Sequence, residues 1–124
     1  MDEIVGTFAG DGATWTFRKS VDGRVVVVDF EKRGSEIPRG VYRAHGVVHV
    51  SSLTLHWFDS LGDVVIIKGD VEPLVFDGDG VHLELSLDGE LLDYALELKT
   101  AALVLEGSCR RAQAPENQFD VGVM

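Results

Sequence analysis

Residues 13–31 read ATWTFRKSVDGRVVVVDFE. Apolar and polar side chains alternate on both sides of Asp22-Gly23, which is the period of a strand with one buried face. Asp-Gly is a strong hairpin signal, because these residues tolerate the positive φ angles of a tight turn. A turn at Asp22-Gly23 places Trp15 opposite Phe30, so one face of this hairpin is apolar and the other is polar.

The same pattern recurs along the chain, at Asp11-Gly12, Asp77-Gly78, Asp79-Gly80 and Asp88-Gly89. A turn at Asp11-Gly12 places Phe8 opposite Trp15. A turn at Asp88-Gly89 places Leu85 opposite Leu92, Leu83 opposite Tyr94 and Glu84 opposite Asp93. We predict about nine or ten strands, at residues 3–9, 13–20, 24–32, 40–44, 47–58, 63–68, 72–76, 81–87, 91–99 and 101–109.

Sequential hairpins of this kind predict an all-β, antiparallel up-and-down meander that closes into a small β-barrel. A two-sheet β-sandwich is the alternative, with crossovers near residues 33–39 or 58–63. We assign residues 1–110 to a single barrel domain. Residues 111–124 lose the periodicity and are predicted to form a loosely ordered tail.

The start of the chain resembles the lipocalin-like (calycin) barrels. Ile4-Val5-Gly6-Thr7-Phe8 and Gly12-Ala13-Thr14-Trp15 are similar to the first strands of that family, in which a Gly-x-Trp motif begins the barrel. Here the spacing is Gly-x-x-Trp, one residue longer. The resemblance implies a barrel and assigns no ligand.

Composition limits the function classes. The chain has 124 residues and a net charge of −10, and most of the excess acid lies in its second half. Such a surface disfavours nucleic acid and anionic membranes and favours a basic protein partner. We expect a cytoplasmic protein, since no apolar segment has the length of a membrane span or the order of a secretory signal. The single Cys109 fits a reducing compartment and is expected to be a packing residue.

The richest region for chemistry is residues 41–58, which contain three of the four histidines. A turn at His45-Gly46 would place Tyr42 opposite His49, with Trp57 on the same face as His49. His49 and His56 would then lie on opposite faces of one strand, so no metal site is expected. The absence of a metal motif and of a nucleotide motif means that no cofactor is expected either. Glu84 opposite Asp93 is the one predicted carboxylate pair, and the Asp77–Gly80 run fits turns better than a calcium loop.

The leading hypothesis is a barrel that binds a hydrophobic small molecule in its interior. Its ligand-binding residues would be Trp15, Phe17, Phe30, Leu55, Trp57 and Leu83. The second hypothesis is a cyclase or isomerase acting on a flexible apolar substrate, with Tyr42, His49 and Tyr94 as catalytic residues. The third is an acidic protein-interaction module of the inhibitor or immunity type. Exposed sheet edges, if the barrel is open, would also favour a homodimer.

Overall fold

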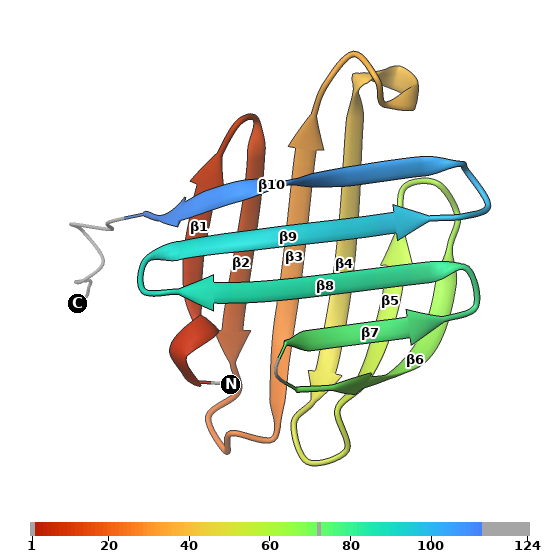
Figure 1. Cartoon of the computed structure of the whole chain (residues 1–124). Helices are drawn as coiled ribbons and strands as arrows, with labels where there is room; N and C mark the ends of the chain where they lie inside the picture. Colours follow the sequence, from red (N-terminus) through yellow and green to blue (C-terminus); the bar gives the residue numbers. More distant parts are fainter. Residues whose placement is uncertain (1, 72, 113–124) are drawn as a thin grey trace.

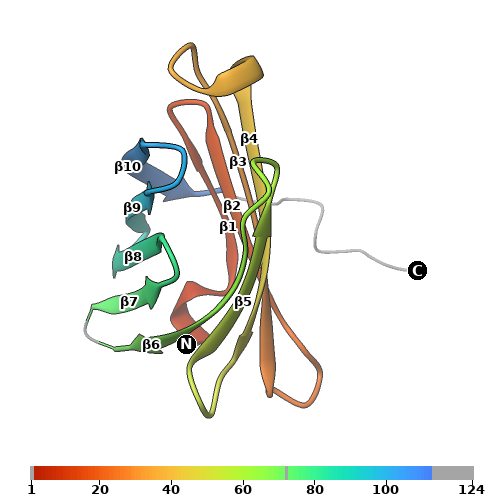
Figure 2. The ribbon, with the colours of Figure 1, turned by 90° about the vertical axis from the view of Figure 1, so that its right-hand side faces the viewer.

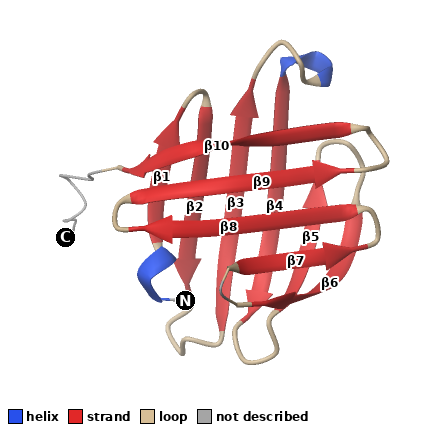
Figure 3. Cartoon of the chain, viewed as in Figure 1, coloured by secondary structure: helices blue, strands red, loops and turns tan. Residues whose placement is uncertain are grey.

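The computed structural model describes residues 2–71 and 73–112, and nearly all of them lie in strands or tight turns (Figure 3). Two short 3-10 helices, η1 (Asp2–Ile4) and η2 (Pro38–Gly40), accompany ten strands. The strands are β1 (Gly6–Gly10), β2 (Ala13–Lys19), β3 (Val25–Arg33), β4 (Val41–His49), β5 (Thr54–Asp59), β6 (Val64–Asp70), β7 (Leu74–Gly78), β8 (Val81–Asp88), β9 (Leu91–Leu98) and β10 (Leu103–Arg111). The prediction of an all-β chain is confirmed.

The strands form a closed antiparallel barrel in which each strand pairs with its neighbours in sequence and β1 pairs with β10. This confirms the barrel and excludes the two-sheet sandwich. The barrel is flattened: β7–β10 run across β1–β4 at a steep angle (Figure 1), and the side view shows them as a separate layer (Figure 2). Inward-facing side chains of both layers form one hydrophobic core.

Each end of the barrel is covered by an isoleucine from a short helical segment. At one end, which we call the η1 end, Ile4 is 6% exposed. At the opposite η2 end, the connection between β3 and β4 carries η2, and Ile37 just before η2 is 3% exposed (Figure 1). Both side chains belong to the core cluster, and an open depression of about 400 Å³ adjoins Ile4 at the η1 end.

The predicted hairpin registers are confirmed for the first three strands. Trp15 pairs with both Phe8 and Phe30. The Asp11-Gly12 turn has φ angles of 50° and 78°, as a type I′ turn requires. A continuous aromatic surface therefore faces the interior from these strands.

The predicted register at Asp88-Gly89 is wrong by two residues. Asp88 belongs to the strand and pairs with Leu91, so the two loop residues are Gly89 and Glu90. Of these two only Gly89 has a positive φ, 63°, which fits a type II′ turn with glycine in the first central position. Leu85 therefore pairs with Tyr94, Leu83 with Leu96 and Glu84 with Ala95. The shift is even, so each side chain keeps its predicted face.

The predicted turn at His45-Gly46 is also wrong, because β4 passes through both residues without interruption. Gly46 faces the core, where a Cβ atom would lie 2.9 Å from Leu55 Cδ1 and 3.2 Å from Trp57 Cε3. The glycine is therefore needed for close packing. The chain turns instead between β4 and β5, where Leu53 has a φ of 49°.

The last strand runs further than predicted. β10 ends at Arg111, whose guanidinium donates to the carbonyl oxygens of Val5 (2.7 Å) and Glu3 (2.6 Å) and so fixes η1. The amide of Ala112 donates to the Thr7 carbonyl at 2.8 Å. The rest of the predicted tail, residues 113–124, lies outside the described residues.

Candidate functional site

Side chains fill the interior of the barrel. Phe8, Trp15, Tyr42 and Trp57 are at most 1% exposed. An enclosed void of about 10 Å³ lies toward the η1 end, with Ile4 and Leu74 among its lining residues. That volume holds about one water molecule, whereas pockets for small ligands have volumes of hundreds of Å³.

An aromatic cluster occupies the η2 half of the interior. The rings of Trp15 and Phe30 stack with centroids 4.0 Å apart, and Tyr94 meets both edge-on at 5.5 and 5.4 Å. Tyr42 lies 5.9 Å from Phe30. Four residues that the sequence places in a binding site therefore come together here.

The other predicted ligand-binding residues lie elsewhere in the core. Phe17, Leu55 and Leu83 line the small void toward the η1 end. Trp57 lies beneath Gly46 on the β5 side of the barrel. Phe17 connects the void to the aromatic cluster, because its ring stacks on Trp15 with centroids 5.7 Å apart.

Among the residues that the structure describes, three buried donors in this core have no hydrogen-bond partner: the indole N–H groups of Trp15 and Trp57 and the hydroxyl of Tyr94. These side chains are 0%, 1% and 4% exposed, respectively. Leaving a buried donor unpaired costs about 1–3 kcal/mol, so such groups are rare in native proteins and call for an explanation.

A lysine that the sequence analysis overlooked joins the η2 end. Lys32 follows Val26, Val28 and Phe30 on the inward face of β3 and is 8% exposed. Its Nζ donates to the carbonyl oxygen of Asp11 at 3.2 Å. The alternation of β3 could have revealed it, because the parity that buries Phe30 also turns Lys32 inward.

Tyr42 has a partner, unlike Tyr94. Its hydroxyl donates to Asp59 Oδ2 at 2.7 Å, while Asp59 Oδ1 accepts from the amides of Leu61 and Asp63, each at 3.0 Å. Burial and the Asp59 carboxylate raise the pKa of Tyr42 far above its usual value. The nearby Trp57 indole opposes this shift, although its N–H makes no hydrogen bond to the Tyr42 hydroxyl. Burial and the neighbouring Asp59 also raise the pKa of Asp63.

Two further titratable groups at the η2 end, Tyr94 and Cys109, remain protonated at neutral pH. Burial raises the pKa of Tyr94 to about 12. Burial also raises the pKa of the Cys109 thiol, against a smaller lowering by Lys32. The η2 end therefore presents unpartnered hydrogen-bond donors together with a lysine.

His49 lies outside the barrel, so the predicted face shared by Tyr42 and His49 is wrong. Tyr42 pairs with Lys32 on the interior side, whereas His49 is exposed at the end of β4. His49 and His56 also lie on two adjacent strands rather than one, with ring centroids 5.1 Å apart on the outer surface. The structure brings Tyr42 and Tyr94 into one cluster and separates His49 from both.

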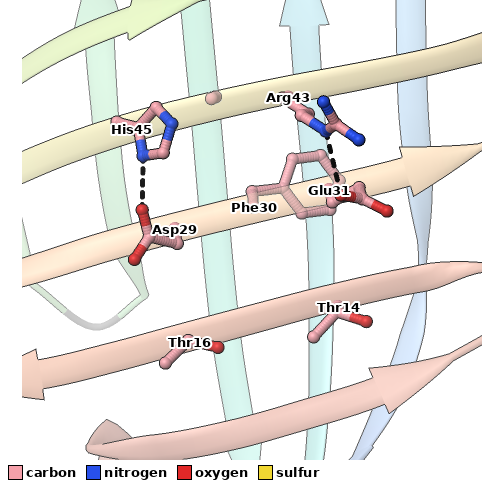
Figure 4. A pocket seen from close by; sticks show the side chains of 8 residues that line it. Thr14, Thr16, Asp29, Phe30, Glu31, Arg43 and His45 are labelled. Carbon is pink, nitrogen blue, oxygen red and sulfur yellow. Dashed lines mark hydrogen bonds and ion pairs between the residues drawn. The ribbon is translucent and has the colours of Figure 1, made fainter.

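A shallow groove of about 270 Å³ crosses the outer face of β2, β3 and β4 (Figure 4). His45 contacts Asp29, and Arg43 donates to Glu31 at 3.0 Å. In the cross-strand row Asp29 lies between Thr16 and His45, so the histidine cannot activate the threonine hydroxyl. Arg43 and Glu31 form an ion pair, and the groove contains no nucleophile paired with a base.

The outer face of β7–β10 is acidic, with Glu84, Asp93, Glu97 and Glu106 pointing to solvent. The predicted Glu84–Asp93 pair is wrong because of the register shift: Asp93 pairs with Ser86 and Ser108. His82 lies between Asp77 (3.1 Å) and Glu84 (3.7 Å). A basic partner for this face stays a prediction.

Within residues 2–71 and 73–112, no three His, Cys, Asp or Glu side chains are arranged to hold a metal ion. No helix in this part of the chain is long and apolar enough to cross a membrane. Comparisons of the sequence with protein-family models and curated proteins, and of the fold with solved structures, found no match in any of the three.

Proposed function

We propose that the protein binds a small, largely apolar molecule that carries hydrogen-bond acceptors, at the η2 end of the barrel interior. The observation that supports this best is the pair of buried, unpartnered donors in the aromatic cluster, on Trp15 and Tyr94. A ligand oxygen beside them would restore hydrogen bonds that the protein alone leaves unmade.

The surroundings of these donors suit such a ligand. Trp15, Phe30 and Tyr94 present stacked and edge-on aromatic surfaces, which bind apolar groups by burial and ring contact. The same cluster offers few free acceptors, because the Asp59 carboxylate already accepts three hydrogen bonds. The ligand is therefore apolar in its body and an acceptor at one end.

Binding requires the η2 end to open, because the interior is filled. The cover is the β3–β4 connection, in which Ile37 is buried and Arg39 adopts a φ of 63°. Its internal hydrogen bonds are short-range: the Gly40 amide donates to the Ile37 carbonyl at 2.8 Å, and the Gly34 amide to Gly40 at 3.1 Å. Such a segment can move as a unit without breaking the barrel ladder.

A matched pair of variants tests this function. Prodan, a neutral fluorescent ketone, reports an apolar site by a blue shift and by energy transfer from Trp15 and Trp57. Ile37→Ala should accelerate prodan association severalfold, because it removes the side chain that covers the η2 end. Ile4→Ala makes the same change at the opposite end and should leave the association rate unchanged.

Two results would count against the proposed function. If prodan shows neither a blue shift nor energy transfer with the wild-type protein and with Ile37→Ala, the interior is a packed core only. If Ile4→Ala accelerates association and Ile37→Ala does not, the ligand enters at the η1 end and the unpartnered donors are not its site. The cyclase or isomerase alternative stays a prediction, to be tested by turnover once a ligand is known.

A further inference from the structure

Lys32 places a cationic side chain inside the barrel. It occupies the last inward-facing position of β3 and is 8% exposed. Its cross-strand partners are Ala13 and Tyr42. Lysine is rarely buried to this extent unless its charge is paired. Its position beside the aromatic cluster therefore requires a physical reason.

The protein itself compensates this lysine poorly. An ammonium group has three donors, and within residues 2–71 and 73–112 Nζ makes one hydrogen bond, to the carbonyl of Asp11. None of the carboxylates in the described part of the chain lies within ion-pair distance of Nζ. Asp59 is engaged by Tyr42 and two amides, and the side chains of Asp11 and Glu36 are exposed at the rim of this end.

The polar groups of the aromatic cluster do not compensate it either, because neither makes a hydrogen bond to Nζ. The Tyr94 hydroxyl and the Trp15 indole have no partner. A buried cation at the same end of the barrel as unpartnered donors matches an anion with more than one acceptor oxygen. Neutral acceptors such as an ether or an alcohol would satisfy the donors and leave the charge of Lys32 unpaired.

We propose that the ligand of the η2 end is an organic anion, a carboxylate with an apolar body, whose charged group pairs with Lys32 while its body lies against Trp15 and Phe30. This inference rests on the proposed function and adds the chemical class of the ligand. It also assigns Lys32 the role of selecting charge.

Three probes with the same eight-carbon chain separate the classes: octanoate, the neutral octanamide and the cationic octylammonium. Their affinities can be measured by calorimetry and by the fluorescence of the buried tryptophans. We expect octanoate to bind at least tenfold more tightly than octanamide, which corresponds to about 1.4 kcal/mol. Octylammonium should bind more weakly than octanamide, because it would bring a second cation next to Lys32.

Variants of one residue connect the preference to Lys32. Lys32→Met keeps an unbranched side chain and removes the charge, so octanoate should lose its tenfold advantage. Lys32→Arg restores a cation and should recover most of it. Lys68→Met is the matched control, because Lys68 is exposed on the outer face of β6 and should not affect binding.

The outcomes distinguish the inference from the function on which it rests. If octanamide binds as tightly as octanoate, or if Lys32→Met keeps the preference for octanoate, the ligand class is wrong although the site exists. If none of the three probes binds the wild-type protein, both proposals are overturned. Melting curves of each folded variant exclude loss of binding through unfolding.

Discussion

Replacing Lys32 by methionine should stabilise the protein while it removes the preference for an anion. Methionine keeps the apolar stem against the core and removes an ammonium group that has one hydrogen bond, to the Asp11 carbonyl. Removing a buried, poorly compensated charge gains about 1–3 kcal/mol. A chain of this length has an unfolding entropy of about 0.26 kcal/mol/K, so Tm should rise by about 4–12 °C.

The assay is thermal and urea unfolding of the ligand-free protein at pH 7, compared with Lys68→Met. The exposed control should change the free energy of unfolding by no more than about 0.5 kcal/mol. A gain in stability that accompanies a loss of function is typical of a binding residue held in an unfavourable environment. If Lys32→Met instead lowers the free energy of unfolding by 1 kcal/mol or more (about 4 °C in Tm), Lys32 is a structural residue and the reasoning fails.

Three further substitutions test the structure around the site. Gly46→Ala should cost about 1–3 kcal/mol in urea unfolding, because its Cβ would collide with the core; a neutral effect would restore the His45-Gly46 turn. Tyr42→Phe should cost about 1–2 kcal/mol through its lost bond to Asp59, whereas Tyr94→Phe should be neutral or stabilising, because its hydroxyl has no partner; equal losses would contradict this difference. Asp63→Asn tests the pH dependence of stability. The pKa of Asp63 is raised in the folded state, so the folded protein holds this proton more tightly than the unfolded chain does. The stability of the wild-type protein therefore falls as pH rises from 3.8 toward the pKa that Asp63 has in the folded state. The variant should therefore be more stable than wild type at pH 7 and equal to it below 3.8, and a difference that does not change with pH would exclude the carboxyl of Asp63 as its cause.

The fold was predictable because hairpin turns and strand alternation are local. Asp11-Gly12 and the alternation around Asp22-Gly23 specify the registers of the first three strands, and Trp15 pairs as expected. At Asp88-Gly89 the sequence does not reveal which residue takes the first central position of the turn, so the register slips by two. At Gly46 a glycine needed for packing resembles a turn glycine, and only the positions of Leu55 and Trp57 separate the two cases.

The candidate site was predictable in part. Alternation places Trp15, Phe30 and Tyr94 in the interior, where the structure has them. Lys32 follows the same alternation, yet a charged residue near the end of a strand suggests solvent when the sequence is read alone. Buried donors without a partner cannot be predicted from the sequence, because they depend on the orientation of each indole and hydroxyl within the packed core.

The most direct measurement follows the two indole N–H signals by ¹H–¹⁵N NMR as octanoate is added, with Trp57→Phe used to assign Trp15. In the ligand-free protein we expect both signals in positions typical of N–H groups without an acceptor, since neither donor has a partner in the structure. Octanoate should move the Trp15 signal downfield as the indole gains a hydrogen bond, and it should not do so in Lys32→Met. If octanoate leaves the Trp15 signal in place and shifts only outward-facing residues, the η2 end of the barrel is not a binding site.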